Sequence, residues 1–239
     1  NLLKWMERRE AYAIKGPRQS GKTTLLRILE ESLTKKGAKT VFLNFEDPDV
    51  LEAFETNPKE YVKSFITKEG KYCFLMDEYH YVQDPGKKLK LLFDTFENTK
   101  FIVTGSSSLE LSGAMAKFLV GRVFFFELFP FSFHEFLVTK NLRLTRIYES
   151  RSKKIREFLS TGKAEVKQDI FLKEFSPLFN QYIIFGGYPA VVKAEDPETK
   201  RTILKNIYHT YISRDVIEFL KFTDAFKYRH VVRALAVLI

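Results

Sequence analysis

Eight residues near the start of the chain form a pattern that can bind phosphate. The run is Gly16-Pro17-Arg18-Gln19-Ser20-Gly21-Lys22-Thr23, which fits the spacing G-x-x-x-x-G-K-[ST] of a phosphate loop. Glycines allow the backbone to wrap closely, so that N–H groups converge on phosphate oxygens at a helix amino terminus. The lysine can reach the β- and γ-phosphates, and the threonine hydroxyl can ligate Mg²⁺. We therefore predict a nucleotide site made by this loop and the next residue, Thr24.

A pair of acids follows an apolar run in the middle of the first half. The run is Phe74-Leu75-Met76-Asp77-Glu78. An aspartate at the tip of a buried strand can hold the Mg²⁺ shell, and the adjacent glutamate can orient or deprotonate a water for attack on the γ-phosphate. By itself the pair is also typical of a solvated strand end. Its position after a phosphate loop favours hydrolysis over binding alone.

Two further groups can contribute to the same chemistry. A hydroxyl cluster follows the fourth apolar run, at Thr104-Gly105-Ser106-Ser107-Ser108. Its hydroxyls can contact the γ-phosphate or the attacking water, and they can equally cap a helix. Arg122, just before the fifth run, can face phosphate in a neighbouring subunit as an arginine finger, or be a surface or capping arginine.

Short apolar runs alternate with helical patterns in the first half, which predicts an α/β fold. The expected strands are residues 11–15, 41–45, 73–76, 101–103 and 123–126. Helices are expected after Gly21, from Asn57-Pro58 and from Asp84-Pro85. Nearly continuous apolar runs suit strands that are buried on both faces. The prediction is a parallel five-stranded P-loop NTPase sheet flanked by helices.

The pattern becomes helical after Pro130. Ser132-Phe133-His134-Glu135 has capping-box spacing and predicts a helix start. A second helix is expected to end at Gly186-Gly187-Tyr188-Pro189, and a long one to begin at Asp196-Pro197. The pattern predicts a core over residues 1–130 followed by an all-helical portion.

Composition narrows the class of protein. The chain has 239 residues, 45% hydrophobic and 29% charged, with 24 Phe, which excludes wholesale disorder. Its single cysteine, Cys73, excludes an internal disulfide framework, and no apolar stretch is long enough to cross a membrane. We expect a cytoplasmic protein without a membrane partner. The net charge of +9 suits an anionic partner.

Taken together, these motifs resemble the AAA-type ATPases of the archaeal and bacterial AAA_14/DUF4143 group. The resemblance is carried in order by Gly16–Leu25, Leu75-x-Asp77-Glu78, Thr104-Gly105-Ser106-Ser107, Gly121-Arg122, Leu128-x-Pro130-Phe131-Ser132-Phe133-x-Glu135-Phe136, Gly186-Gly187-Tyr188-Pro189-Ala190 and Ser213-Arg214-Asp215. It implies an ASCE-type sheet with the strand before the phosphate loop central, an all-helical lid over 131–196, and a winged-helix region whose first helices, over 197–239, end this chain.

The resemblance also implies roles for individual residues. Thr104 and Ser106 fall at the first sensor position, and Arg122 falls at the place of the arginine finger. Gly187-Tyr188-Pro189 is similar to the G-x-P element of STAND-type ATPases, whose proline packs near adenine, although a helix-ending turn explains it equally. Arg214 contacts phosphate or a lid acid, or else pairs with its own acidic neighbours. The chain departs from the group at Tyr79-His80-Tyr81-Val82, where an apolar residue and a glutamine are usual.

The leading hypothesis is an ATPase that hydrolyses ATP with Mg²⁺ to move the lid and the region after it. A nucleotide-switched DNA-binding module is the alternative, because basic residues gather in one run: Lys140, Arg143, Arg146, Arg151, Lys153, Lys154 and Arg156. That run also suits a solvated helix face. A protein-partner switch of STAND type with little turnover is the third possibility. The expected partners are ATP or ADP, DNA at the basic run, and further copies of the chain.

Overall fold

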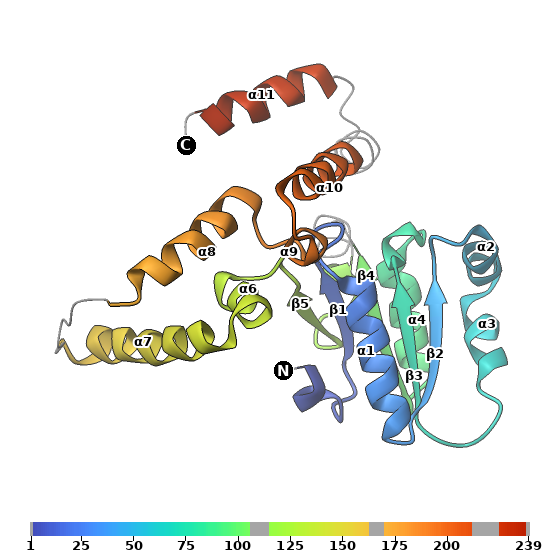
Figure 1. Cartoon of the computed structure of the whole chain (residues 1–239). Helices are drawn as coiled ribbons and strands as arrows, with labels where there is room; N and C mark the ends of the chain where they lie inside the picture. Colours follow the sequence, from blue (N-terminus) through green and yellow to red (C-terminus); the bar gives the residue numbers. More distant parts are fainter. Residues whose placement is uncertain (1, 106–114, 163–169, 212–224, 238–239) are drawn as a thin grey trace. The chain divides into compact units, whose positions relative to one another are not determined.

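The computed structural model describes residues 2–105, 115–162, 170–211 and 225–237. The chain divides into two compact units, Asn1–Leu128 and Phe129–Ile239 (Figure 1). We describe each unit by itself.

The first unit is built on a five-stranded sheet in the order β2-β3-β4-β1-β5, in which all paired neighbours are parallel. The strands are β1 (Ala11–Lys15), β2 (Lys39–Asn44), β3 (Tyr72–Asp77), β4 (Thr99–Gly105) and β5 (Val123–Glu127). This confirms the predicted parallel sheet. β1 is an interior strand, although β4 rather than β1 takes the middle place that the resemblance assigned to it.

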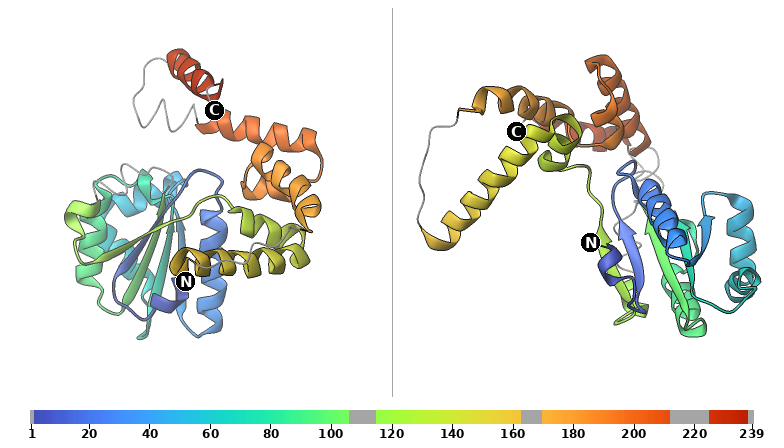
Figure 2. Two further views of the ribbon diagram at one scale, coloured as in Figure 1. Left: turned by 90° about the vertical axis from the view of Figure 1, so that its left-hand side faces the viewer. Right: turned by 60° about the horizontal axis from the view of Figure 1, so that its bottom comes forward.

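Helices cover both faces of this sheet (Figures 1 and 2). They are α1 (Lys22–Lys35), α2 (Pro48–Thr56), α3 (Pro58–Phe65), α4 (Pro85–Thr95) and the short α5 (Met115–Phe118), with 3₁₀ turns η1 (Leu2–Trp5) and η2 (Tyr79–Tyr81). Successive residues of β3 face opposite sides. Cys73 and Leu75 therefore pack with Leu26 of α1, whereas Phe74 and Met76 belong to the core beneath α2, α3 and α4.

Helix α2 was not expected from the sequence, although its start carries a recognisable signal. Asp47 caps the helix by accepting a hydrogen bond from the backbone N–H of Asp49 at 3.0 Å, and Pro48 takes the first helical position. An aspartate followed by proline also begins α4 and α10, although of these two only Asp196 of α10 accepts a capping hydrogen bond on its side chain. The cap of α3, Asn57, follows α2 directly, so two short helices lie where we expected one.

The described part of the second unit is helical. Its helices are α6 (Phe133–Lys140), α7 (Leu142–Thr161), α8 (Leu172–Phe185), α9 (Pro189–Lys193), α10 (Pro197–Thr210) and α11 (Ala225–Val237). The capping box at the start of α6 is present in both directions, between Ser132 and Glu135. The division of this unit into a lid and the opening of a winged-helix region stays a prediction.

A backbone clamp closes the base of the α6–α8 segment. The N–H of Phe131 donates to the carbonyl of Gly187 at 2.7 Å, and the Tyr182 hydroxyl donates to the Phe131 carbonyl at 2.9 Å. A Cβ at position 187 would lie 1.9 Å from that same Phe131 oxygen. Only glycine fits so close an approach of two backbones.

Membrane insertion by a helix has no support in the described residues, because none of their helices is both long enough and apolar enough to span a bilayer.

Candidate functional site

The phosphate loop lies between β1 and α1, at the carboxyl edge of the sheet. Gly21 is the N-cap of α1 and has a φ of 100°, a conformation that L side chains rarely adopt. Gln19 also has a positive φ of 61°. These two turns bend the chain so that the first N–H groups of α1 face the loop, the arrangement that binds anions at helix amino termini.

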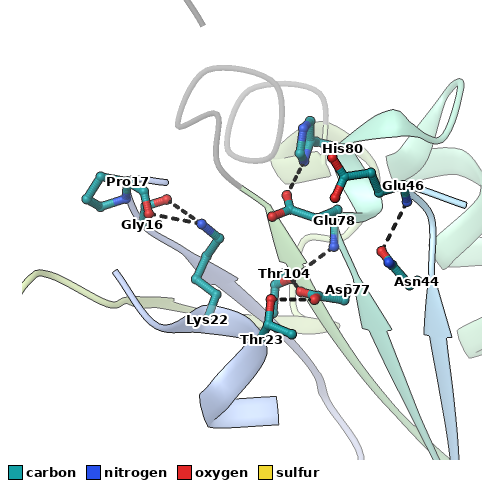
Figure 3. Close-up of polar contacts among 10 residues, drawn as sticks. All are labelled: Gly16, Pro17, Lys22, Thr23, Asn44, Glu46, Asp77, Glu78, His80 and Thr104. Carbon is teal, nitrogen blue, oxygen red and sulfur yellow. Dashed lines mark hydrogen bonds and ion pairs between the residues drawn. The ribbon is translucent and has the colours of Figure 1, made fainter. Parts of the chain in front are cut away.

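Lys22 is folded back onto its own loop. Its Nζ donates to the carbonyls of Gly16 at 3.1 Å and Pro17 at 3.0 Å, and the residue is only 4% exposed (Figure 3). Gly16 packs against the end of β5, since a Cβ there would lie 2.2 Å from the Leu128 carbonyl oxygen. The buried Ser20 hydroxyl has no hydrogen-bond partner among the residues described. A buried hydroxyl of this kind fits a loop that accepts a ligand.

Asp77 is held between two hydroxyls at the tip of β3. The Thr23 Oγ1 donates to Asp77 Oδ2 at 2.6 Å, and the Thr104 Oγ1 donates to Asp77 Oδ1 (Figure 3). The structure thus brings together the last residue of the phosphate loop and the first residue of the acidic pair, which are 54 positions apart in the chain. Parallel strands place their carboxyl ends at one edge, which explains the meeting.

The Thr23 and Asp77 oxygens fit the preferences of Mg²⁺. This ion binds hard oxygen donors and usually keeps several waters, taking one or two protein ligands plus phosphate oxygens. A hydroxyl and a carboxylate oxygen 2.6 Å apart beside the phosphate loop supply those two ligands. The donor set therefore suits Mg²⁺ bound together with a nucleotide.

Glu78 has an unusual backbone and a largely buried carboxylate. Its φ of 51° and ψ of 39° lie in the left-handed region, a conformation that costs a residue other than glycine about 1–3 kcal/mol. Its Oε2 lies 3.1 Å from the Nδ1 of His80. Burial would raise the pKa of this carboxyl, but His80, Lys22 and Arg18 together outweigh burial and lower the pKa below its ordinary value. Glu78 is thus held ionised, as a proton acceptor must be.

Thr104 connects both acids. Besides donating to Asp77, its fully buried hydroxyl accepts a hydrogen bond from the backbone N–H of Glu78 at 3.1 Å. A hydroxyl has one proton to donate. In this state that proton goes to Asp77, so Thr104 organises the acidic pair. The other predicted sensor residue, Ser106, lies outside the described residues, as does Arg214.

Three other predicted residues occupy the loop and the first turn of α1. Arg18 lies near enough to Glu78 to influence its charge, Gln19 is exposed at the turn, and Thr24 is exposed on α1. Pro189, in the second unit, is the first residue of α9, directly after its N-cap Tyr188. Its predicted contact with adenine stays a prediction.

Arg122 lies at the opposite edge of the sheet from the phosphate loop. Val123, the next residue, pairs with Ala11 at the start of β1, whereas the loop follows Lys15 at the end of β1. The Arg122 Nε donates to Asp94 Oδ1 at 2.9 Å. The length of β1 therefore separates Arg122 from the phosphate loop of its own chain, and any contact with phosphate would be with another copy.

Two residues at the carboxyl edge of the sheet, Asn44 and His80, were not assigned a role from the sequence. Asn44, the last residue of β2, pairs in register with Asp77, and its Oδ1 accepts from the Glu46 N–H at 3.1 Å. His80 contacts Glu78, as described above. A polar residue directly after an apolar strand run was the available signal for Asn44. The signal for His80 was its place in Tyr79-His80-Tyr81-Val82, where the sequence departs from the motif of the group it resembles.

The sheet order, the phosphate loop and the acidic strand tip define a P-loop nucleotide-binding fold of the AAA type. A family model described as an AAA domain, AAA_14, matches residues 8–137, more than half of the chain. The chain therefore belongs to this family of AAA-type P-loop ATPases. The DUF4143 part of the resemblance stays a prediction. A second model, described as a domain of unknown function (DUF8612), matches residues 176–238.

Two curated relatives are themselves uncharacterized. One from Haemophilus influenzae is 29% identical over 208 residues, covering 85% of this chain and 45% of the relative. One from Methanocaldococcus jannaschii is 28% identical over 205 residues, covering 86% of this chain and 41% of the relative. The chain thus spans less than half the length of these relatives.

Solved structures of similar fold were also found. Aeropyrum pernix ORC1 in complex with DNA is 15% identical with a TM-score of 0.43, covering 87% of this chain and 62% of that chain. AMPPCP-bound DnaA from Aquifex aeolicus is 13% identical with a TM-score of 0.44, covering 99% of this chain and 85% of that chain. Because both TM-scores lie below 0.5, these likenesses carry no argument about function.

Proposed function

We propose that this chain binds ATP with Mg²⁺ and hydrolyses it, and that hydrolysis drives a conformational change in the helical second unit, Phe129–Ile239. The observation that carries the proposal is the contact between the Thr23 hydroxyl and Asp77 at 2.6 Å, with Lys22 and Glu78 as their chain neighbours. This contact brings the phosphate loop, the proposed metal ligands and the proposed proton acceptor to one edge of the sheet.

Each residue has a distinct task in this proposal. Lys22 exchanges the Gly16 and Pro17 carbonyls for the β- and γ-phosphate oxygens of ATP. Thr23 and Asp77 hold Mg²⁺, which when bound neutralises charge on the phosphates. Glu78 accepts a proton from a water as the water oxygen bonds to the γ-phosphorus and the bond to the β-phosphate oxygen breaks. The products are ADP and phosphate.

The test is steady-state phosphate release together with binding of a fluorescent ATP analogue. Lys22→Ala should lose binding and turnover. Glu78→Gln keeps the shape of the side chain but cannot accept a proton, so it should bind nucleotide and lose turnover by at least about 100-fold. Glu69→Gln, the same change at an exposed residue before β3, is the matched control and should behave as wild type. Wild-type turnover no faster than that of Lys22→Ala or Glu78→Gln would refute the proposal.

Arginine-finger action by Arg122 requires a second copy of the chain. The Arg122–Asp94 ion pair provides a control, because Arg122→Ala and Asp94→Ala break the same contact. If Arg122 reaches the nucleotide of a neighbour, only Arg122→Ala lowers turnover, by a factor on the order of 1,000. Equal turnover in the two variants would assign Arg122 to the ion pair alone. A strictly monomeric active enzyme would also exclude the finger.

DNA binding is a second candidate function, supported by the exposed cations of α7. Two of the seven basic residues of the run have partners near the start of α8. Arg143 pairs with Glu174, and Arg151 lies over the rings of Phe171 and Phe175. Arg146, Lys154 and Arg156 remain exposed. Duplex DNA binding that requires ATP, falls steeply with salt and is lost when these three become alanine would support this function, and no binding at low salt would exclude it.

A further inference from the structure

We propose that His80 is a positioning residue that fixes the carboxylate of Glu78 for proton transfer. This inference rests on the proposed hydrolysis, in which His80 has so far had no role. It starts from the contact between His80 Nδ1 and Glu78 Oε2, at 3.1 Å (Figure 3).

The imidazole is well placed to restrain its neighbour. Its side chain has no exposed surface, and its ring lies against the ring of Tyr81 with centroids 4.4 Å apart. The buried ring belongs to the turn η2 directly after β3, so its position follows from the backbone rather than from a flexible stem. A group held in this way can fix a partner with little further loss of conformational entropy.

The backbone of Glu78 is also fixed. Its N–H donates to Thr104 at 3.1 Å, and its φ of 51° aims the side chain away from the direction an ordinary strand end would give. Its side chain still has rotatable bonds between backbone and carboxylate. The contact with His80 holds Oε2, so that Oε1 is the oxygen that faces the attacking water. Thr104 thus fixes the backbone position of Glu78, and His80 fixes the position of its carboxylate.

A packing role alone would give a different pattern of mutant effects. Reaction rates respond steeply to misplacement of a catalytic group, by up to about 100-fold for 1 Å. A positioning role therefore predicts a loss in kcat without a loss in nucleotide binding. It also predicts rescue by a side chain that restores only the polar contact.

The variants follow from the atom that makes the contact. His80→Phe keeps a ring against Tyr81 and removes the nitrogen. His80→Asn places an amide nitrogen near the position of Nδ1 and removes the ring. We expect His80→Phe to lower kcat about tenfold with KM and ATP-analogue binding unchanged, and His80→Asn to recover kcat to within about threefold of wild type. Tyr81→Leu, which removes the packing partner, should leave kcat within about threefold.

Two results would overturn the inference. One is wild-type kcat in His80→Phe while Glu78→Gln is inactive. The other is equal loss in His80→Phe, His80→Asn and Tyr81→Leu with a lowered unfolding midpoint, which would assign His80 to packing. A double variant separates the inference from the proposed function: in the Glu78→Gln background, His80→Phe should cause no further loss. If Glu78→Gln itself turns over like wild type, the proposed function fails first, whatever His80 does.

Discussion

Two lysines near opposite edges of one sheet each donate hydrogen bonds to two backbone carbonyls, but their roles differ. Lys22, at the carboxyl edge, donates to the carbonyls of Gly16 and Pro17. Lys100, near the amino edge, donates to the carbonyls of Arg8, at 2.9 Å, and Glu10. The Lys22 partners precede it by six and five residues, whereas those of Lys100 lie 92 and 90 residues away.

That difference in sequence separation decides what each lysine can do. The Lys22 partners belong to its own loop, so exchanging them for phosphate leaves the rest of the sheet intact. Lys100 ties β4 to the segment before β1 and lies over the Tyr12 ring at 3.7 Å, beside a cavity of about 290 Å³. Giving up its partners would loosen two elements. Lys22 is therefore available to a ligand, and Lys100 connects two elements of the fold.

The largest expected effect separates the two lysines directly. Lys22→Met should lower turnover by at least about 100-fold, because a donor to the transferred phosphate is lost, with an unchanged thermal midpoint. Lys100→Met should change the thermal midpoint and leave kcat unchanged. Phosphate release and thermal unfolding of both variants measure this. Loss of turnover in Lys100→Met at temperatures where it is folded would break the comparison.

Thr104→Val should affect both properties, because its hydroxyl serves both acids of the site. Removing it leaves the Asp77 carboxylate and the Glu78 N–H without their buried partner, which costs about 1–3 kcal/mol of unfolding free energy. Turnover should fall about tenfold through misplacement of Glu78. Thr104→Ser restores the hydroxyl and is the control. Urea unfolding and phosphate release give the two readings, and a valine variant with wild-type turnover would contradict the role assigned to Thr104.

Gly16→Ala tests how tightly the loop is packed against β5. Its Cβ would meet the Leu128 carbonyl oxygen at 2.2 Å, so the backbone must move, at a cost of about 1–3 kcal/mol. Weaker binding of the ATP analogue should accompany the shift of the loop. Gly37→Ala gives a comparison of different origin, because nothing lies within 4 Å of its Cβ but its φ of 82° strains an L side chain. A Gly16→Ala variant with wild-type unfolding free energy and wild-type binding of the ATP analogue would show that the contact with β5 is unimportant.

The last comparison is a pH dependence specific to Lys100. Burial lowers its pKa from 10.5 to about 8 in the folded protein. Between pH 8 and 10.5 the unfolded chain therefore holds a proton that the folded chain has released, so wild-type stability should rise with pH relative to Lys100→Met. Urea midpoints of the two proteins at pH 7 and pH 10 measure the difference, and other titrating groups cancel. A constant difference would mean that Lys100 is not desolvated.

Much of the first unit could be predicted because its signals are local. Apolar runs marked all five strands, and the spacing of Leu26 and Leu29 marked the buried face of α1. The contact of Thr23 with Asp77 followed from the rule that parallel strands end at one edge. The resemblance implied the type of sheet but placed the strand before the phosphate loop at its centre, a position that β4 occupies.

What could not be predicted depends on distances through space. That Thr104 would give its proton to Asp77, or that His80 would reach Glu78, is fixed by tertiary packing rather than by residue type. The contacts of Arg143 and Arg151 are of the same kind, since they depend on Glu174 and Phe171 from beyond α7.

The clamp between Phe131 and Gly187 has a consequence for how this protein can vary. The chain leaves the clamp at Phe131, runs through α6, α7 and α8, and returns to the same point at Gly187. Residues added or removed between α7 and α8 would not change the register of α9 or α10, because the chain before α6 and the chain after α8 are already hydrogen-bonded to each other. This segment can therefore differ in length between homologues while the rest of its unit keeps its construction.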